Sequence, residues 1–211
     1  MVCIFYFVSK KNLKVEQGKA TRDRLVELAF RIFSENGYAA TALDALIKEA
    51  GLTKGALYHH FKSKLALFEA VYIRAEEEVA TRINNASAGA TDPWDQLLEG
   101  CDAYLEACAD PGLQRILRLD GPSVLGWERW SQIDAEFGSG KLEIFLEILN
   151  QSEVIDVSST RALSHLLSGA LNEATFWIAQ AQDSNEALVQ SRKVLRKMLN
   201  GIRKSGNNIS A

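Results

Sequence analysis

The sequence predicts an all-α protein of about nine helices, arranged as a small three-helix domain followed by a larger helical domain. Apolar residues recur every three or four positions along most of the chain, which is the period of an amphipathic helix packed against a core. Glycine, proline and capping residues interrupt this period at spacings typical of helix ends. The 211 residues, 47% of them hydrophobic and 24% charged, are sufficient to bury such a core.

The first helix is predicted from about Ala20 to Asn36, where Gly37 ends it. Its apolar stripe consists of Leu25, Leu28, Ala29, Ile32 and Phe33. Residues 1–19 are expected to form a flexible extension before this helix. The apolar run at residues 2–8 lacks the preceding basic region and the small-residue cleavage site of a signal peptide.

Two short helices follow, joined by a tight turn. Thr41 is a candidate N-cap for a helix from Ala42 to Ala50, and Gly51 can adopt the left-handed conformation that ends it. Thr53 is expected to cap the third helix, because its hydroxyl can accept a hydrogen bond from the following turn. Three short helices within about 45 residues, the last two joined by a glycine-containing turn, are typical of a helix-turn-helix.

The third helix has one bulky face and one nearly bare face. Leu57 and Phe61 lie on the bulky face. The bare face consists of Gly55, Ala56 and His59, flanked by Lys54 and Tyr58. Small residues let a helix backbone approach a ligand closely, as in the DNA major groove, although they also suit a weak helix packed on another element. His59 and His60 point about 100° apart, so we do not expect them to share a metal ion.

A longer pattern surrounds this helix. Phe33, Gly37 and Tyr38 close the first helix as F-x-x-x-G-Y. The second part of the pattern consists of Thr41, Leu46, Ala50, Gly51, Leu52, Thr53, Lys54, Gly55, Leu57, Tyr58, His60, Phe61, Ser63 and Lys64. With these spacings, the segment from Ala20 to about Lys64 resembles the DNA-binding domain of tetracycline-repressor-like (TetR family) transcriptional regulators.

The resemblance implies a set of DNA contacts. It places Lys54, Gly55, Ala56 and His59 near base edges, Tyr58, His60 and Lys64 near phosphates, and Thr41 against the DNA backbone, and it includes Thr53 in the binding surface. One position departs from the family pattern: Ala42 stands where a second threonine is frequent, which removes one phosphate contact. Readout by Ala56 is limited to contact with a thymine methyl group.

The charge distribution agrees with a nucleic-acid partner for the first part of the chain. The formal net charge is −3. Residues 1–64 hold 11 Lys and Arg against 6 Asp and Glu, a net of +5, whereas residues 65–211 hold 13 against 21, a net of −8. The basic segment can therefore meet a polyanion while the acidic remainder stays away from it.

Residues 65–204 are predicted to form the second domain, with 205–211 as a C-terminal tail. A long helix from Ser63 or Lys64 to about Asn85 links the two domains, and Asp92 and Pro93 begin the next one. Further breaks are expected at residues 110–112 and 120–122. The glycines at 138 and 140 either split or only kink the segment from Trp127 to Asn150.

The last two helices are predicted from Thr160 to Ala181 and from about Asp183, a capping residue, onward. Their stripes, which the resemblance assigns to a four-helix dimer bundle, include Leu163, Leu167, Ala170, Leu171, Ala174, Ile178, Leu188, Leu195 and Leu199. A two-fold operator requires a second copy, which favours dimerisation. The alternative is that both stripes complete the core of this chain.

Aromatic and polar side chains in the second domain suggest a pocket for a small apolar or aromatic ligand. The candidate lining residues are Trp94, Tyr104, Trp127, Trp130, His165, Asn172, Glu173 and Trp177. The aromatic members are equally compatible with ordinary core positions, because aromatic rings carry much of the buried area of any core.

Other classes of function receive little support. Ser164, His165 and Ser168 share a helix without a placed carboxylate, so no catalytic residue, metal site or cofactor is predicted. No apolar run reaches the roughly 20 residues of a membrane helix, and three cysteines favour a reducing, cytoplasmic location. The resulting hypothesis is a homodimeric repressor that releases a palindromic DNA operator when a ligand binds. The alternative is a helical small-molecule-binding module without sequence-specific DNA readout.

Overall fold

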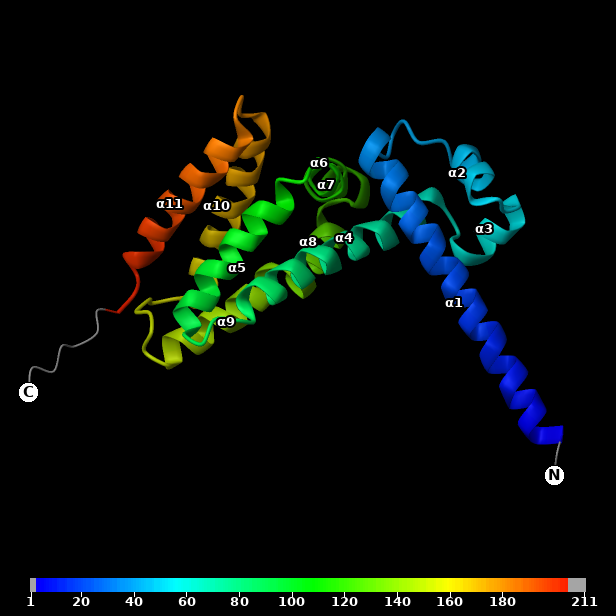
Figure 1. Ribbon diagram of the computed structural model, residues 1–211, viewed down its shortest axis with the longest axis horizontal. Helices are drawn as coiled ribbons and strands as arrows, with labels where there is room; N and C mark the ends of the chain where they lie inside the picture. The colour runs from blue at the N-terminus through cyan, green and yellow to red at the C-terminus, as the bar shows by residue number, and fades with distance from the viewer. Residues whose placement is uncertain (1–2, 205–211) are drawn as a thin grey trace, which may run out of the picture. The chain divides into compact units, whose positions relative to one another are not determined.

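The computed structural model describes residues 3–204, with side chains from Val15 onward (Figure 1). All elements named in the described part are helical, which confirms the predicted all-α class, and one isolated β-bridge joins Ile155 and Arg203. Backbone contacts divide the chain into two compact units, Met1–Arg74 and Ala75–Ala211. The boundary lies within a helix, whereas the sequence placed it at the start of that helix. The predicted tail at 205–211 lies outside the described residues.

Unit 1 contains α1 (Cys3–Asn36), α2 (Leu43–Ala50), α3 (Lys54–His60) and the beginning of α4 (Lys64–Ser87). The first helix begins at Cys3 and not near Ala20, so the expected flexible extension is helical between residues 3 and 19. This segment contains no proline, and its one glycine, Gly18, has open space beside it, so no residue there terminates the helix.

The helix ends of unit 1 have the glycine conformations and the cap predicted from the sequence, except at Thr41. Gly37 and Gly51 have φ of 79° and 66°, the left-handed conformation expected at helix ends. Thr53 caps α3, accepting a hydrogen bond from the Ala56 N–H at 3.2 Å. Thr41 does not cap α2, because its hydroxyl donates instead to the Gly37 carbonyl at 2.8 Å. Ala42 occupies the N-cap position without a side-chain hydrogen bond.

An aromatic cluster fixes α1 against α4 within unit 1. The Phe33 ring lies 5.4 Å from the Phe68 ring and 5.8 Å from the Tyr38 ring, measured between centroids. The surrounding buried residues are Leu25, Ala29, Leu46, Leu57, Phe61, Leu67 and Val71. Each large apolar side chain buried here stabilises the fold by roughly 1.5–3 kcal/mol relative to exposure.

Unit 2 holds the rest of α4 and the remaining helices. These are α5 (Pro93–Cys108), α6 (Pro111–Gln114), the π-helical η1 (Arg115–Asp120), α7 (Gly121–Leu125), α8 (Trp127–Phe137), α9 (Ser139–Gln151), α10 (Thr160–Gln180) and α11 (Ser184–Asn200). The described residues thus form more segments than the nine expected. The stretch from 111 to 125 is divided into three pieces, and Gly138 splits α8 from α9 where the sequence left a kink possible.

Side-chain caps begin most of the long helices in unit 2. Asp92 accepts from the Trp94 N–H at 2.9 Å, and Asp183 accepts from the Glu186 N–H at 3.0 Å, as the sequence predicts. Ser159 caps α10 in the same way. Each such cap stabilises its helix by about 1 kcal/mol, because it satisfies a backbone donor that has no partner within the helix.

The core of unit 2 lies between α5, α9, α10 and α11, which pack side by side (Figure 1). Cys101 and Cys108 are buried in α5 as free thiols. Burial raises the pKa of Cys101 from its ordinary 9.0 to about 12, and burial also raises the pKa of Cys108. Both thiols therefore stay protonated near neutral pH and pack as small apolar groups.

A charged cluster ties α5 to α11. The Asp102 carboxylate accepts a bond from Arg196 Nε at 3.1 Å, while Arg192 Nη2 donates to the Asp102 carbonyl at 3.2 Å. The Asp102 side chain is only 18% exposed, so solvent screens these contacts less than it screens a surface pair. Arg192 also reaches Glu106 at 3.1 Å, but the Glu106 side chain is 69% exposed.

We predict that Asp102→Ala lowers the free energy of unfolding by about 1.5–3 kcal/mol, the range for hydrogen bonds to charged groups. Urea denaturation of the full chain measures this. Glu106→Ala is the matched control, and its exposed ion pair should contribute less than about 1 kcal/mol. If both substitutions lower the free energy of unfolding equally, the contacts of Asp102 between α5 and α11 stabilise the fold no more than the exposed Glu106 pair does.

We also predict that stability falls with rising pH above 9.0. The Cys101 thiol ionises near 9.0 in the unfolded chain but only near about 12 in the folded one, so deprotonation favours unfolding within this window. Each pH unit then costs up to about 1.4 kcal/mol. Denaturation at pH 8 and pH 10 should show a smaller loss in Cys101→Ala than in the wild type. An unchanged pH dependence would contradict the assignment.

Candidate functional site

Unit 1 presents α3 with one face anchored and the other open. Leu57 and Phe61 are buried, whereas Lys54, Gly55 and His59 are exposed. A Cβ built on Gly55 would meet no atom within 4 Å. The bare face predicted from the sequence is therefore a free surface within this unit.

Charged and polar side chains border this surface. The Lys54 ammonium lies 3.7 Å from the Asp44 carboxylate of α2, and both side chains are well exposed. The Tyr58 ring is 38% exposed. The imidazoles of His59 and His60 lie 5.3 Å apart, with His60 partly buried. These groups supply hydrogen-bond donors of the kind that contact phosphate oxygens.

Lys64 and Thr41, also predicted to contact DNA, are engaged inside unit 1. Lys64 donates to the Tyr38 carbonyl, and its ammonium lies 4.2 Å from the centroid of the Tyr38 ring. Thr41 is buried and bonded to the Gly37 carbonyl. Both residues hold the turn that precedes α2, so they position the helix-turn-helix. Thr53, which caps α3, has the same kind of role.

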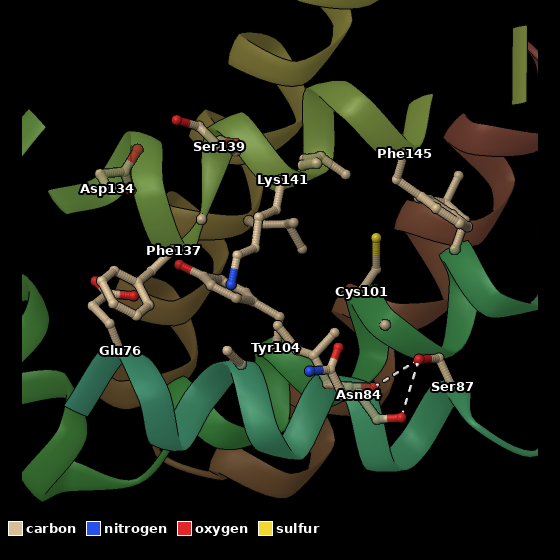
Figure 2. Close-up of a pocket in the computed structure, with 18 of the residues that line it drawn as sticks. Glu76, Asn84, Ser87, Cys101, Tyr104, Asp134, Phe137, Ser139, Lys141 and Phe145 are labelled. Atoms are coloured by element: carbon tan, nitrogen blue, oxygen red, sulfur yellow. Dashed lines mark hydrogen bonds between the residues drawn. The ribbon is translucent and has the colours of Figure 1, made fainter. Parts of the chain in front are cut away.

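Unit 2 contains a cavity of about 360 Å³ between α4, α5, η1, α8, α9 and α10 (Figure 2). Its size lies within the range of small-molecule sites. Apolar atoms provide most of the surface, through Ile83, Leu97, Phe137, Leu142, Phe145 and Leu171. Polar side chains include Glu76, Asn84, Gln96, Tyr104, Arg118, Asp134, Lys141 and Asn172. A ligand bound here would therefore contact both apolar and polar side chains.

A partly buried hydrogen-bond chain forms part of the cavity wall. Arg118 donates to the Tyr104 hydroxyl, which in turn donates to the Asn172 side-chain carbonyl. Burial raises the pKa of Tyr104 well above its ordinary value, so the phenol stays protonated and can donate. Arg118 belongs to the π-helical turn η1, an irregularity that is frequent at functional sites.

Two of the eight pocket residues predicted from the sequence, Tyr104 and Asn172, line this cavity. The other six do not. Trp94 is buried in the core of unit 2. Trp127, 74% exposed, lies against Trp130 with ring centroids 5.2 Å apart. His165, Glu173 and Trp177 are on the exposed side of α10. At 100° per residue, Glu173 and Trp177 lie about 100° and 140° around the helix from Asn172, whereas His165 is about two turns, roughly 10 Å, away along the axis.

The structure adds lining residues that the sequence analysis missed. Glu76 on α4 and Arg118 on η1 are buried charged side chains, and Lys141 comes from the beginning of α9. One signal was available: Glu76 interrupts an apolar stripe between Val71 and Val79. The convergence of these residues could not be predicted, because they come from helices far apart in the sequence.

The residues predicted for a dimer interface are mostly inside unit 2. Leu167, Leu171, Ile178, Leu195 and Leu199 are buried in its core, and Leu163, Ala174 and Leu188 pack against it. Of the predicted set, Ala170 is exposed. Within the single chain, most of the predicted set therefore lies in or against the core of unit 2. A neighbouring set, Leu166, Trp177, Val194 and Met198, is exposed on α10 and α11.

A shallow groove lies among these exposed residues, between α10 and α11. Ala170, Trp177, Val194 and Met198 line it, and Leu105 and Leu195 are also in its wall. Its lining is almost entirely apolar.

Comparisons with known proteins agree with this architecture. Residues 94–202 match the family model described as "Tetracyclin repressor-like, C-terminal domain", and residues 25–71 match "Bacterial regulatory proteins, tetR family". Together the two matches span both units. Within the described part of the chain, no helix is long and apolar enough to cross a bilayer.

Individual relatives are similar over different lengths. The Transposon Tn10 TetC protein of Escherichia coli is 30% identical over 166 residues, 77% of this chain and 82% of that protein. The HTH-type transcriptional regulator UidR of Escherichia coli (strain K12) is 36% identical over 78 residues, 37% of this chain and 39% of that protein.

Solved structures extend the similarity to the whole fold. A crystal structure of a TetR-family transcriptional regulator from Pectobacterium atrosepticum has a TM-score of 0.76 and 35% identity, covering 90% of this chain and 97% of that one. A TetR transcriptional regulator from Chloroflexus aurantiacus, 22% identical with a TM-score of 0.75, shares the fold. It covers 90% of this chain and 100% of that one. The chain belongs to the TetR family of helix-turn-helix transcriptional regulators.

Proposed function

We propose that the protein binds a palindromic DNA operator as a homodimer and releases it when a small molecule enters the cavity of unit 2. The observation that carries this proposal is the open face of α3, where Gly55 and His59 are exposed above the buried Leu57 and Phe61. A helix anchored on one side and bare on the other is suited to the major groove.

The open face assigns a role to each residue around it. Gly55, Ala56 and His59 approach base edges, and Tyr58 and His60 donate to phosphates. Lys54 exchanges its contact with Asp44 for the DNA, which is inexpensive because an exposed pair contributes little. Thr41, Thr53 and Lys64 act by holding the turns, and Thr53 and Lys64 also stand at the N-termini of α3 and α4, where phosphates are favoured.

Dimerisation is proposed through α10 and α11. The exposed apolar residues Leu166, Ala170, Trp177, Val194 and Met198, and not the buried stripe, form the contact surface. A second copy would remove this surface from water and would supply the second DNA-reading helix that a two-fold operator requires.

Ligand response is proposed to act through α4. This helix contributes Glu76, Ala80, Ile83, Asn84 and Ser87 to the cavity wall and is continuous back to Lys64, directly after the helix-turn-helix. A ligand that moves the cavity end of α4 therefore displaces the residues that precede it. The ligand favours the released state only by the difference between its affinities for the two states.

We predict that Gly55→Glu weakens operator binding at least 100-fold while leaving the thermal midpoint unchanged. The added side chain meets no protein atom, but it places bulk and negative charge between the helix and the DNA. Fluorescence anisotropy with DNA from upstream of the gene measures the affinity, and wild-type binding should fall steeply with salt.

Gly89→Glu is the matched control for this prediction. It introduces the same charge at a glycine of unit 2 that also has open space beside it, and it should bind DNA like the wild type. Equal affinities of Gly55→Glu and Gly89→Glu would refute the DNA-reading role of α3 and favour a helical binding module without sequence-specific readout.

We predict that Met198→Glu converts the dimer to a monomer. Met198 is 61% exposed within the chain, so the substitution is tolerated by the fold but buries an unpaired charge in the proposed contact. Light scattering coupled to size-exclusion chromatography gives the mass. Ile144→Glu, at an exposed apolar position of α9, should stay dimeric. A dimeric Met198→Glu variant would place the interface elsewhere.

A further inference from the structure

We propose that the cavity of unit 2 selects a small organic carboxylate with an apolar ring, and that Lys141 pairs with the carboxylate. This inference rests on the proposed use of the cavity as a ligand site and specifies its chemistry. It changes the expectation of an apolar or aromatic ligand, because it requires one negative charge in addition to the apolar body.

Lys141 brings a positive charge into the cavity. It lies in the first turn of α9 and lines the cavity, and Figure 2 shows its side chain extending inward toward Tyr104. Its ammonium lies 5.3 Å from the centroid of the Phe137 ring. No carboxylate in the described part of the chain is within 4.0 Å of it. The charge is thus held over the cavity without an internal counter-ion.

The other charged groups of the cavity do not neutralise Lys141. Glu76 and Arg118 are both buried, have opposite charges and have interactions of their own within the protein. Both act electrostatically on Tyr104 and Cys108, with opposite signs, so they lie in one region of the wall. Asp134 lines the rim, and its carboxylate is directed away from Lys141 (Figure 2). A ligand carboxylate would therefore provide the missing negative charge.

The start of α9 forms part of the cavity wall. Gly138 and Ser139 line the cavity, α9 has no side-chain cap, and its first turn contains no acidic residue. An acidic group beside this end comes from α8: Asp134 Oδ1 lies 3.3 Å from the position of a Cβ on Gly138, so it offsets part of the positive end of the helix dipole. The turn is also tightly fixed: a Cβ on Gly140 would lie 2.1 Å from the Ala135 carbonyl oxygen, so only glycine fits there.

The apolar part of the lining suits an apolar ligand body. Leu97 of α5 lines the cavity, as do Leu142 and Phe145 of α9, the helix that also carries Lys141. The Ser87 hydroxyl donates to the Ile83 carbonyl of its own helix at 3.0 Å, so it is not directed at a ligand. At about 360 Å³ the cavity lies near the lower end of small-molecule sites, roughly 300–1,000 Å³, which favours a ligand of one or two rings.

Calorimetric titration of the full chain with three matched probes tests the proposal. The probes are 2-naphthoate, 2-naphthamide and 2-naphthylmethylamine, which share a ring system and differ in charge. We expect the acid to bind 10- to 100-fold more tightly than the amide, and the amine to bind least well. Lys141→Met should remove the advantage of the acid over the amide, a change of about 1.4–2.8 kcal/mol at 1.4 kcal/mol per tenfold.

Two further variants make the result specific. Lys141→Arg keeps the charge and should retain most of the preference for the acid, whereas Lys193→Met makes the same substitution outside the cavity lining and should behave like the wild type. Amide or amine binding as tight as acid binding, absence of acid binding, or an acid preference that survives in Lys141→Met would each overturn the proposal.

The titration contains no DNA, so its outcome is separate from the proposed regulatory function. Operator binding is then measured with and without 2-naphthoate. If 2-naphthoate binds through Lys141 but leaves operator affinity unchanged, the preference for a carboxylate stands, and release of the operator by this probe is rejected. If 2-naphthamide releases the operator as effectively as the acid does, control of DNA binding by a ligand stands, and the preference for a negatively charged ligand is rejected.

Discussion

The arrangement of unit 1 depends on the burial of Leu57 and Phe61 beneath α3. These two side chains fix the rotation of a helix of only seven residues, which would not be stable alone in water. Because they point inward, Gly55 and His59 must point outward. The Phe33, Tyr38 and Phe68 cluster supports this anchor from α1 and α4. The composition of the exposed face is therefore a consequence of core packing on the other side of the same helix.

In unit 2, hydrogen bonds connect several of the polar side chains that line the cavity. The chain from Arg118 through Tyr104 to Asn172 connects η1, α5 and α10. Such a network is stable only when its members hold one another, because an unpaired polar group in a low dielectric is costly. The wall of the cavity is consequently organised before any ligand binds. Lys141, on α9, also lines the cavity but is outside this network.

The two outer helices show why an apolar stripe is ambiguous. On α10 and α11 one set of apolar residues, including Leu171 and Leu195, fills the core of unit 2, while a second set, including Trp177 and Met198, faces outward. Both sets have helical spacing, so periodicity alone does not tell which one another molecule covers. The two sets differ in their exposure in the folded chain. The proposed dimer contact is therefore assigned to the exposed set and not to the buried one.

The sequence by itself determined the all-α class, most helix ends, the caps at Thr53, Asp92 and Asp183, and the family to which the chain belongs, because these depend on residues close together in the chain. Only the tertiary structure decided that Thr41 bonds to Gly37 and that α1 continues back to Cys3. It alone decided which residues line the cavity. Glu76, Arg118 and Lys141 meet there because α4, α5, η1, α8, α9 and α10 converge, and the rotation of each helix is set by packing partners distant in sequence.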